Sequence, residues 1–132
     1  MSAWSERDLA RIGAADEILV APDQGDRSRG PAVPIWVVRV GDELYVRSYR
    51  GASGGWYRRA RFSRNGRIRS RGNEFRVRFS EVAAPELRAQ IDEAYRVKYG
   101  RYGSRYVTPM TSDSVAETTL RLEPAWLNDT DN

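Results

Sequence analysis

Cysteine and histidine are both absent from this chain of 132 residues. Without cysteine there can be no disulfide and no thiolate nucleophile. Without histidine the chain lacks Ser–His dyads, nearly all zinc chemistry and the commonest general base near neutral pH. Any catalysis would therefore use carboxylates, tyrosine, arginine, Lys98, backbone amides or a bound cofactor. The sequence assigns no catalytic residue and predicts no metal site.

Long apolar runs are also missing, so no segment is expected to span a bilayer. The opening residues, Met-Ser-Ala-Trp-Ser-Glu-Arg, carry charges where a secretory signal needs an apolar core, which predicts a cytoplasmic protein. Hydrophobic residues make up 40% and charged residues 30%, a composition typical of globular domains. The length predicts a single domain over residues 1–132, with a tail over 124–132.

Lysine is scarce, since Lys98 is the only one, and nearly all cations are arginines. Eleven arginines and a single acid, Glu74, lie between Arg47 and Arg78, so this window carries +10 although the whole chain carries +4. The rest of the chain is therefore acidic. The planar fork of arginine suits phosphate and carboxylate groups. The alternative is that arginines on strands simply face water.

Hydrophobic periodicity and turn residues divide the chain into short elements. The apolar run 35–40 predicts a central strand covered on both faces, and Gly41-Asp42 predicts a hairpin to a strand over 43–49. The other predicted elements are a helix that begins after Ser5 and ends at Gly13, a strand over 17–22, a short helix over 56–62, a hairpin of strands 66–71 and 74–81, a long helix over 85–99, a turn-rich segment over 101–113 and a closing strand from 115 or 116 to 122.

This order of elements predicts a mainly β fold with a few helices. Six short strands joined by tight turns favour a small six-stranded antiparallel β-barrel, because closure removes exposed sheet edges. We expect one helix at the N-terminus and one long helix in the C-terminal half of the chain.

A glycine-rich loop follows the strand over 43–49 and indicates an anion site. Gly51, Gly54 and Gly55 lie between Ser48 and Trp56. Unpaired backbone amides in a glycine-rich loop, together with a hydroxyl and nearby guanidinium groups, form a candidate phosphate-binding site. For Ser48 the alternative is a hydroxyl that bonds its own loop.

Two arginines are favoured as partners of such an anion. Neighbours on a strand point to opposite faces, and Arg50 shares the parity of Ser48. Arg50 and Arg58 are therefore favoured over Arg47. Trp56 either stacks on a planar ligand ring or anchors the core.

The long helix over 85–99 carries two features with alternative interpretations. Lys98 is either a buried amine with a lowered pKa or a cation that the helix dipole favours near a C-terminus. Asp92 and Arg96 are spaced to pair across one helical turn.

Several stretches resemble an uncharacterised bacterial family, the domain of unknown function 2255. They are Ile-Trp-Val-Val-Arg-Val over 35–40, Leu-Tyr-Val-Arg-Ser-Tyr-Arg-Gly over 44–51, Trp-Tyr-Arg-Arg-Ala over 56–60, Ile-Asp-Glu-Ala-Tyr-Arg-Val-Lys-Tyr over 91–99 and Thr-Thr-Leu-Arg-Leu-Glu-Pro over 118–124. The resemblance covers almost the whole chain.

That family is in turn similar to the FMN-binding split-barrel superfamily, and within it to deazaflavin (F420)-dependent nitroreductase-like proteins. In those proteins a strand ends in Ser-x-x-Gly, a loop follows and a Trp begins a short helix; Ser48, Gly51 and Trp56 are the counterparts. Basic residues before the preceding strand match Arg27 and Arg29. The resemblance implies that Ser48, Arg50, Gly51, Trp56, Arg58 and Arg29 bind the phosphate side of a cofactor.

Three functions follow as hypotheses. The first is a split barrel that binds a phosphorylated flavin or deazaflavin (FMN or F420); if it is an enzyme, it is an oxidoreductase whose redox chemistry the cofactor supplies. The second is a cofactor-free barrel that acts as a small-molecule binder, a pathway accessory or a cofactor-independent enzyme; Gly54 and Gly55 stand where relatives usually have a Pro before the Trp. The third, a nucleic-acid-binding barrel, is disfavoured because the rest of the chain is acidic.

Split-barrel relatives are often homodimers, with the cofactor near the interface. Trp4, Tyr57 and Trp126 are expected to be exposed aromatics, which is compatible with a homodimer.

Overall fold

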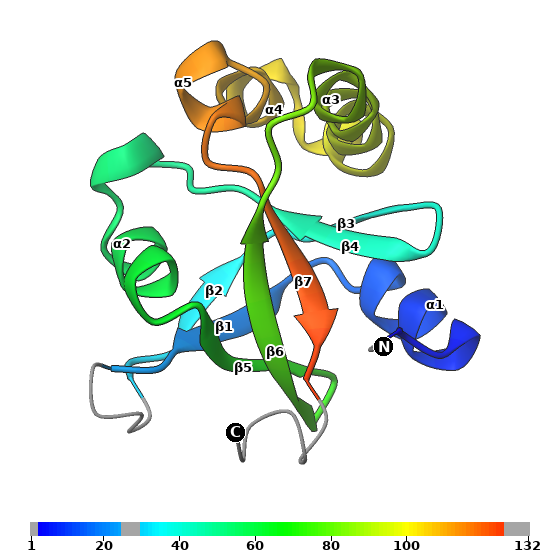
Figure 1. Ribbon diagram of the computed structural model, residues 1–132. Helices are drawn as coiled ribbons and strands as arrows, with labels where there is room; N and C mark the ends of the chain where they lie inside the picture. The colour runs from blue at the N-terminus through cyan, green and yellow to red at the C-terminus, as the bar shows by residue number, and fades with distance from the viewer. Residues whose placement is uncertain (1–2, 25–29, 126–132) are drawn as a thin grey trace.

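A computed structural model describes residues 3–24 and 30–125 (Figure 1). Within these residues, seven antiparallel strands form one curled sheet in the order β2-β1-β5-β6-β7-β4-β3. The strands are β1 (Ile18–Pro22), β2 (Val33–Ile35), β3 (Val38–Val40), β4 (Glu43–Val46), β5 (Asn65–Ser70), β6 (Asn73–Glu81) and β7 (Leu120–Pro124). The predicted antiparallel barrel with added helices is confirmed as a curled half-barrel, with seven strands in place of six.

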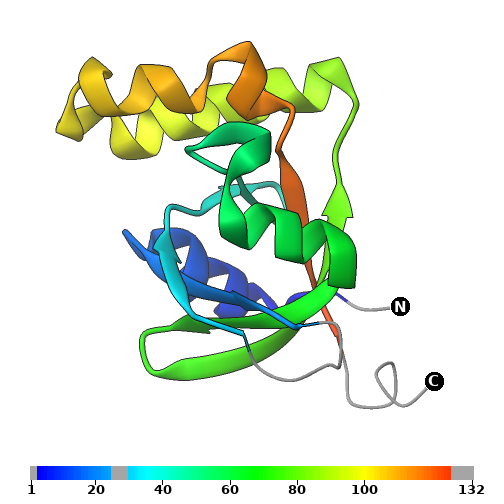
Figure 2. The same ribbon diagram turned by 90° about the vertical axis from the view of Figure 1, so that its left-hand side faces the viewer.

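Helices cover the sheet at three places. In Figure 1, α3, α4 and α5 lie together above the strands, whereas α1 and α2 flank the strands on opposite sides. Figure 2 shows α3 to α5 as one layer across an end of the curled sheet. The helices are α1 (Glu6–Ala14), α2 (Gly55–Ser63), α3 (Pro85–Tyr99), α4 (Ser104–Met110) and α5 (Asp113–Ala116), with 3₁₀ turns η1 (Gly51–Ser53) and η2 (Gly100–Tyr102). No helix in the described ranges has both the length and the apolar character needed to cross a bilayer.

The buried side chains form two clusters on the two faces of the sheet. Leu44 and Val46 belong to the cluster inside the curl, which also holds Trp4, Leu9, Ile12, Ile68, Val77 and Leu122. Tyr45, which lies between them in sequence, packs in the cluster beneath α3 and α4, with Ile91, Tyr95, Tyr99 and Met110. The alternation expected of β4 is therefore confirmed, because both of its faces are buried.

The prediction of one central strand over 35–40 is wrong. The run divides into β2, which pairs with β1, and β3, which pairs with β4, and these two strands lie at opposite ends of the strand order. The Val37 peptide lies at the break and bonds side chains of α3 instead of a strand. Its N–H donates to the Tyr99 hydroxyl at 3.1 Å, and its carbonyl accepts from Lys98 Nζ at 2.6 Å.

Two other predictions of extended or irregular structure are corrected. The strand expected over 43–49 ends at Val46. Residues 101–113, expected to be turns, contain α4 and lead into α5, so that the closing strand starts only at Leu120. These two helices are short, and tertiary burial of Val107, Met110 and Val115 in the second cluster stabilises them.

The remaining elements match their predictions closely. Ser5 caps α1 by accepting from the Asp8 amide at 3.1 Å, although the helix continues one residue past Gly13. Helix α3 has the predicted bounds, and both hairpins turn where expected.

Trp4 and Tyr57, expected to be exposed, are both buried, because Trp4 donates to the Leu122 carbonyl at 2.8 Å and Tyr57 packs in the inner core. Trp126 lies outside the described residues.

Candidate functional site

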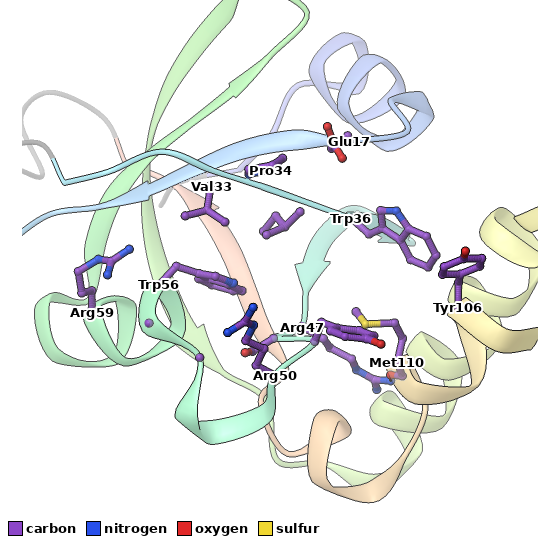
Figure 3. Close-up of a pocket in the computed structure, with 15 residues that line it drawn as sticks. Glu17, Val33, Pro34, Trp36, Arg47, Arg50, Trp56, Arg59, Tyr106 and Met110 are labelled. Atoms are coloured by element: carbon purple, nitrogen blue, oxygen red, sulfur yellow. The ribbon is translucent and has the colours of Figure 1, made fainter.

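A cavity of about 530 Å³ lies between the sheet and the helices (Figure 3). Four segments enclose it: the end of β2, the residues that follow β4, the first turns of α2, and α4. Its lining residues are Glu17, Val33, Pro34, Ile35, Trp36, Arg47, Ser48, Tyr49, Arg50, Gly54, Gly55, Trp56, Arg59, Tyr106 and Met110.

The cavity has a cationic end and an aromatic end. Figure 3 shows Arg59 of α2 at one end and Trp36 and Tyr106 at the other, with Trp56 and Arg50 between them. A ligand with an anionic group and a planar ring therefore meets complementary groups at both ends.

Arg59 is the most unusual group in this cavity. Its side chain is half-buried, and its Nε is buried without a hydrogen-bond partner. A buried N–H without an acceptor costs about 1–3 kcal/mol, and more in a charged group. A ligand in the cavity is one group that can supply the missing acceptor for this Nε–H.

Arg47 lines the same cavity, but its guanidinium is fully engaged within the protein. Nε donates to Thr119 Oγ1 at 2.8 Å, Nη1 donates to the Asp92 carboxylate and to the Met110 carbonyl, and Nη2 donates to the Arg88 carbonyl. The preference for other arginines over Arg47 as ligand-binding groups is consistent with this geometry. Asp92 thus pairs with Arg47, and the predicted Asp92–Arg96 pair is wrong, since Arg96 bonds Glu93.

Ion pairs are distributed unevenly among the arginines from 47 to 78. Six of these eleven described arginines pair with acids: Arg47, Arg61, Arg64, Arg67, Arg69 and Arg76. Three of the other five, Arg50, Arg58 and Arg59, lie beside the glycine-rich loop and on α2. Most of the arginines without an ion pair to a described acid therefore lie around the cavity and on α2.

The glycine-rich loop uses its own polar groups to hold its shape. The Gly51 amide donates to the Ser48 carbonyl at 2.9 Å and the Gly54 amide donates to the Gly51 carbonyl at 3.1 Å. Ser48 Oγ lies 2.8 Å from the same Gly51 carbonyl, and because a carbonyl can only accept, the hydroxyl proton points into the loop. The structure thus supports the alternative for Ser48, and the amides of Gly51 and Gly54 are not free for an anion.

Free backbone amides occur instead at the start of α2. The helical bonding pattern begins with the Arg58 amide, which donates to the Gly54 carbonyl at 3.1 Å. The first amides of a helix, here those of Gly55, Trp56 and Tyr57, have no carbonyl in a preceding turn. Gly55 and Trp56 both line the cavity, so the positive end of the helix dipole adds to Arg59.

The aromatic end is held rigidly by α3. Trp36 stacks on Tyr99 with ring centroids 3.9 Å apart and an interplanar angle of 1°. Burial raises the pKa of Tyr99, so its hydroxyl stays protonated. Next to it, Lys98 donates to the carbonyls of Ala15 and Val37, both at 2.6 Å, and burial lowers the pKa of Lys98 to about 8. Half-buried Lys98 therefore links α3 to the backbone at Ala15 and Val37, and it does not line the cavity.

Comparison with known proteins identifies the family of this chain. A family model described as "Uncharacterized protein conserved in bacteria (DUF2255)" matches residues 8–122. The chain belongs to the DUF2255 family. A search of curated proteins finds no match to this DUF2255 chain.

Solved structures share the fold of this DUF2255 chain at low sequence identity. HutZ, the heme storage protein of Vibrio cholerae, matches with a TM-score of 0.63 and 12% identity over 92% of this chain and 90% of its own. A putative pyridoxamine 5'-phosphate oxidase of Listeria innocua gives 0.58 and 12% over 90% of each chain. An FAD-binding protein of Mesorhizobium loti gives 0.52 and 14% over 92% and 89%. The predicted relation to split-barrel proteins is confirmed at the level of fold.

The DUF2255 structure brings together only part of the predicted site. Ser48, Arg50 and Trp56 line the cavity. Gly51 is buried in the adjacent loop without lining it, and exposed Arg58 points to a second hollow on α2. Arg29 lies outside the described residues.

The structure supports the core-anchor alternative for Trp56. Trp56 belongs to the inner core, where its ring and that of Tyr57 pack edge to face at a centroid distance of 6.2 Å. The residue is 7% exposed and lines the cavity, and stacking on a ligand ring stays a prediction.

Sequence reasoning did not assign every lining residue to the site, and Arg59, Trp36 and Met110 are among those left out. Arg59 follows Gly55 by four positions, so helical spacing within the correctly predicted α2 could have placed it beside the loop. Trp36 could not be found, because it lies at the break of the run that was predicted as one strand. Met110 is on α4, which was not predicted.

Proposed function

We propose that the cavity binds a phosphorylated flavin or deazaflavin, for example FMN or F420, with its ring at the aromatic end and its phosphate at the cationic end. The observation that carries the proposal is the buried, unpartnered Nε of Arg59 in the same cavity as Trp36 and Tyr106. A volume of about 530 Å³ lies within the usual range for small-molecule sites, roughly 300–1,000 Å³.

Different residues would bind the phosphate and the ring of the cofactor. Arg59, Arg50 and the first amides of α2 would donate hydrogen bonds to the phosphate, and Trp56 and Trp36 would contact the ring. A bound flavin or deazaflavin supplies hydride or electron transfer, which explains how a chain without histidine and cysteine would act as an oxidoreductase. The names of the structural neighbours, which mention FAD, heme and pyridoxamine 5'-phosphate, support a cofactor site of this general kind.

The absorbance spectrum of the purified protein, followed by titration with FMN and F420, tests this proposal. Visible flavin or deazaflavin absorbance, or a saturable change in cofactor fluorescence, is the expected result. Protein that is colourless and binds none of FMN, F420 and FAD would contradict the proposal and favour a cofactor-free barrel.

A further inference from the structure

A second hollow of about 540 Å³ adjoins the cofactor cavity on the outer face of α2. It is lined by Asp23, Gln24, Gly55, Arg58, Arg59 and Phe62. Gly55 and Arg59 line both spaces, so the two meet at the first turns of α2.

Helical spacing explains how one helix serves both spaces. Gly55, Arg58, Arg59 and Phe62 recur at intervals of three and four residues, which places them on one face of α2. Gly55 lies at the junction and has no side chain. A Cβ added there would lie 3.4 Å from Arg59 Nη1, so at this position the arginine is the nearest side chain.

The second hollow is cationic despite the aspartate in its wall. The Asp23 side chain is only 2% exposed, and its oxygens bond Arg76 at 3.1 and 3.0 Å and lie 3.6 Å from Arg67. Its charge is therefore compensated inside the protein. Arg58, by contrast, is exposed and forms no ion pair with any described acid.

An aromatic ring completes the second hollow. Phe62 is 79% exposed, so its ring is open to a ligand in this hollow. A phenyl ring beside a guanidinium is a suitable surface for a purine base and its phosphate, because the ring stacks on the base and the cation attracts the phosphate.

We propose that the ligand spans both hollows and is a flavin dinucleotide of the FAD class. This inference depends on the proposed function, since the first cavity would hold the flavin ring. The pyrophosphate lies along Arg59, which borders both hollows, and the adenosine part lies against Arg58 and Phe62. The second hollow thus selects a dinucleotide over FMN.

Comparative titration of FAD and FMN tests the inference. The wild-type protein is expected to bind FAD about tenfold more tightly than FMN, because two additional groups are engaged. Arg58→Ala and Phe62→Ser each reduce FAD affinity by about fivefold or more and change FMN affinity by less than about twofold. Both residues are exposed, so the folded state, checked by circular dichroism, is retained.

The matched control is Arg7→Ala. Arg7 is an exposed arginine of α1 that lines neither hollow, so this variant removes the same charge without touching the proposed contacts. Its FAD and FMN affinities should equal those of the wild type. ADP gives an independent check, since it should compete with FAD and leave riboflavin binding unchanged.

The outcomes separate the two proposals. Equal affinities for FAD and FMN, with no selective effect of Arg58→Ala or Phe62→Ser, would overturn the dinucleotide inference and leave a mononucleotide site. Failure of FMN, F420 and FAD alike to bind would overturn the proposed function, and the dinucleotide inference with it.

Discussion

Arg47 and Asp92 join β4 to α3 through a buried ion pair. The Arg47 side chain is fully buried, whereas the Asp92 side chain retains 23% exposure. The other donors of Arg47 reach Thr119 and the carbonyls of Met110 and Arg88, so one guanidinium ties the end of β4 to α3, to α4 and to the segment just before β7. The position of α4, and therefore of the aromatic end of the cavity, depends on this arginine.

Removing the carboxylate tests that role. Asp92→Ala leaves an uncompensated buried charge, so the free energy of unfolding should fall by about 3 kcal/mol. Urea denaturation followed by circular dichroism measures it. The control is Glu93→Ala, which removes the adjacent exposed carboxylate and should cost at most about 0.5 kcal/mol. Equal effects of the two substitutions would contradict the role of Arg47.

The contact between Gly54 and Ser48 gives a second prediction. A Cβ on Gly54 would lie 2.4 Å from Ser48 Oγ, so Gly54→Ala must displace the loop. We expect Gly54→Ala to lower the free energy of unfolding by about 2 kcal/mol in the wild type. The loss should be at least about 1 kcal/mol smaller when Ser48→Ala has removed the hydroxyl. Additive effects in this double-mutant cycle would show that the two residues are not in contact.

Lys98 gives a prediction about pH. Burial lowers the pKa of Lys98 to about 8 from 10.5, so between these values the unfolded chain holds a proton that the folded chain has released. The contribution of Lys98 to the free energy of unfolding is therefore lowest below pH 8 and rises as the pH increases toward 10.5. After allowance for solvent screening at this half-buried site, the rise should be on the order of 1 kcal/mol by a pH of about 9.5.

The pH dependence is measured by urea denaturation of the wild type and of two variants. Lys98→Met has no titrating group and Lys98→Arg keeps its charge over this range, so both should lack the rise. The tyrosines titrate in all three proteins and cancel in the comparison. Parallel pH profiles for the three proteins would show that Lys98 does not titrate in this window.

The parts of the fold that the sequence predicts well are those specified by local signals. Ser5 capping α1, Pro85 at the start of α3 and the Gly41 and Gly72 turns each act within a few residues. The break at Val37 has no such local signal, because side chains of α3 about sixty residues later hold its peptide groups. A continuous apolar run cannot reveal this long-range bond.

The candidate site, like the fold, is predictable only where neighbouring residues in the sequence determine it. Ser48, Arg50 and Trp56 belong to one continuous stretch, and the sequence predicts their proximity to the cavity. Which polar groups remain free is a property of the folded loop. Ser48 bonds Gly51, whereas Arg59 keeps a buried N–H without a partner, and neither fact follows from residue types.

The affinities of the wild type and of Arg59→Ala for FMN and riboflavin test the central claim most directly, because these ligands differ only by the phosphate. If Arg59 binds the phosphate, the wild type should bind FMN at least about tenfold more tightly than riboflavin. Arg59→Ala should remove most of this difference, and the control Arg78→Ala, an exposed arginine of β6 outside the cavity, should retain it. Equal affinity of the wild type for FMN and riboflavin, or a difference that survives in Arg59→Ala, would contradict the account.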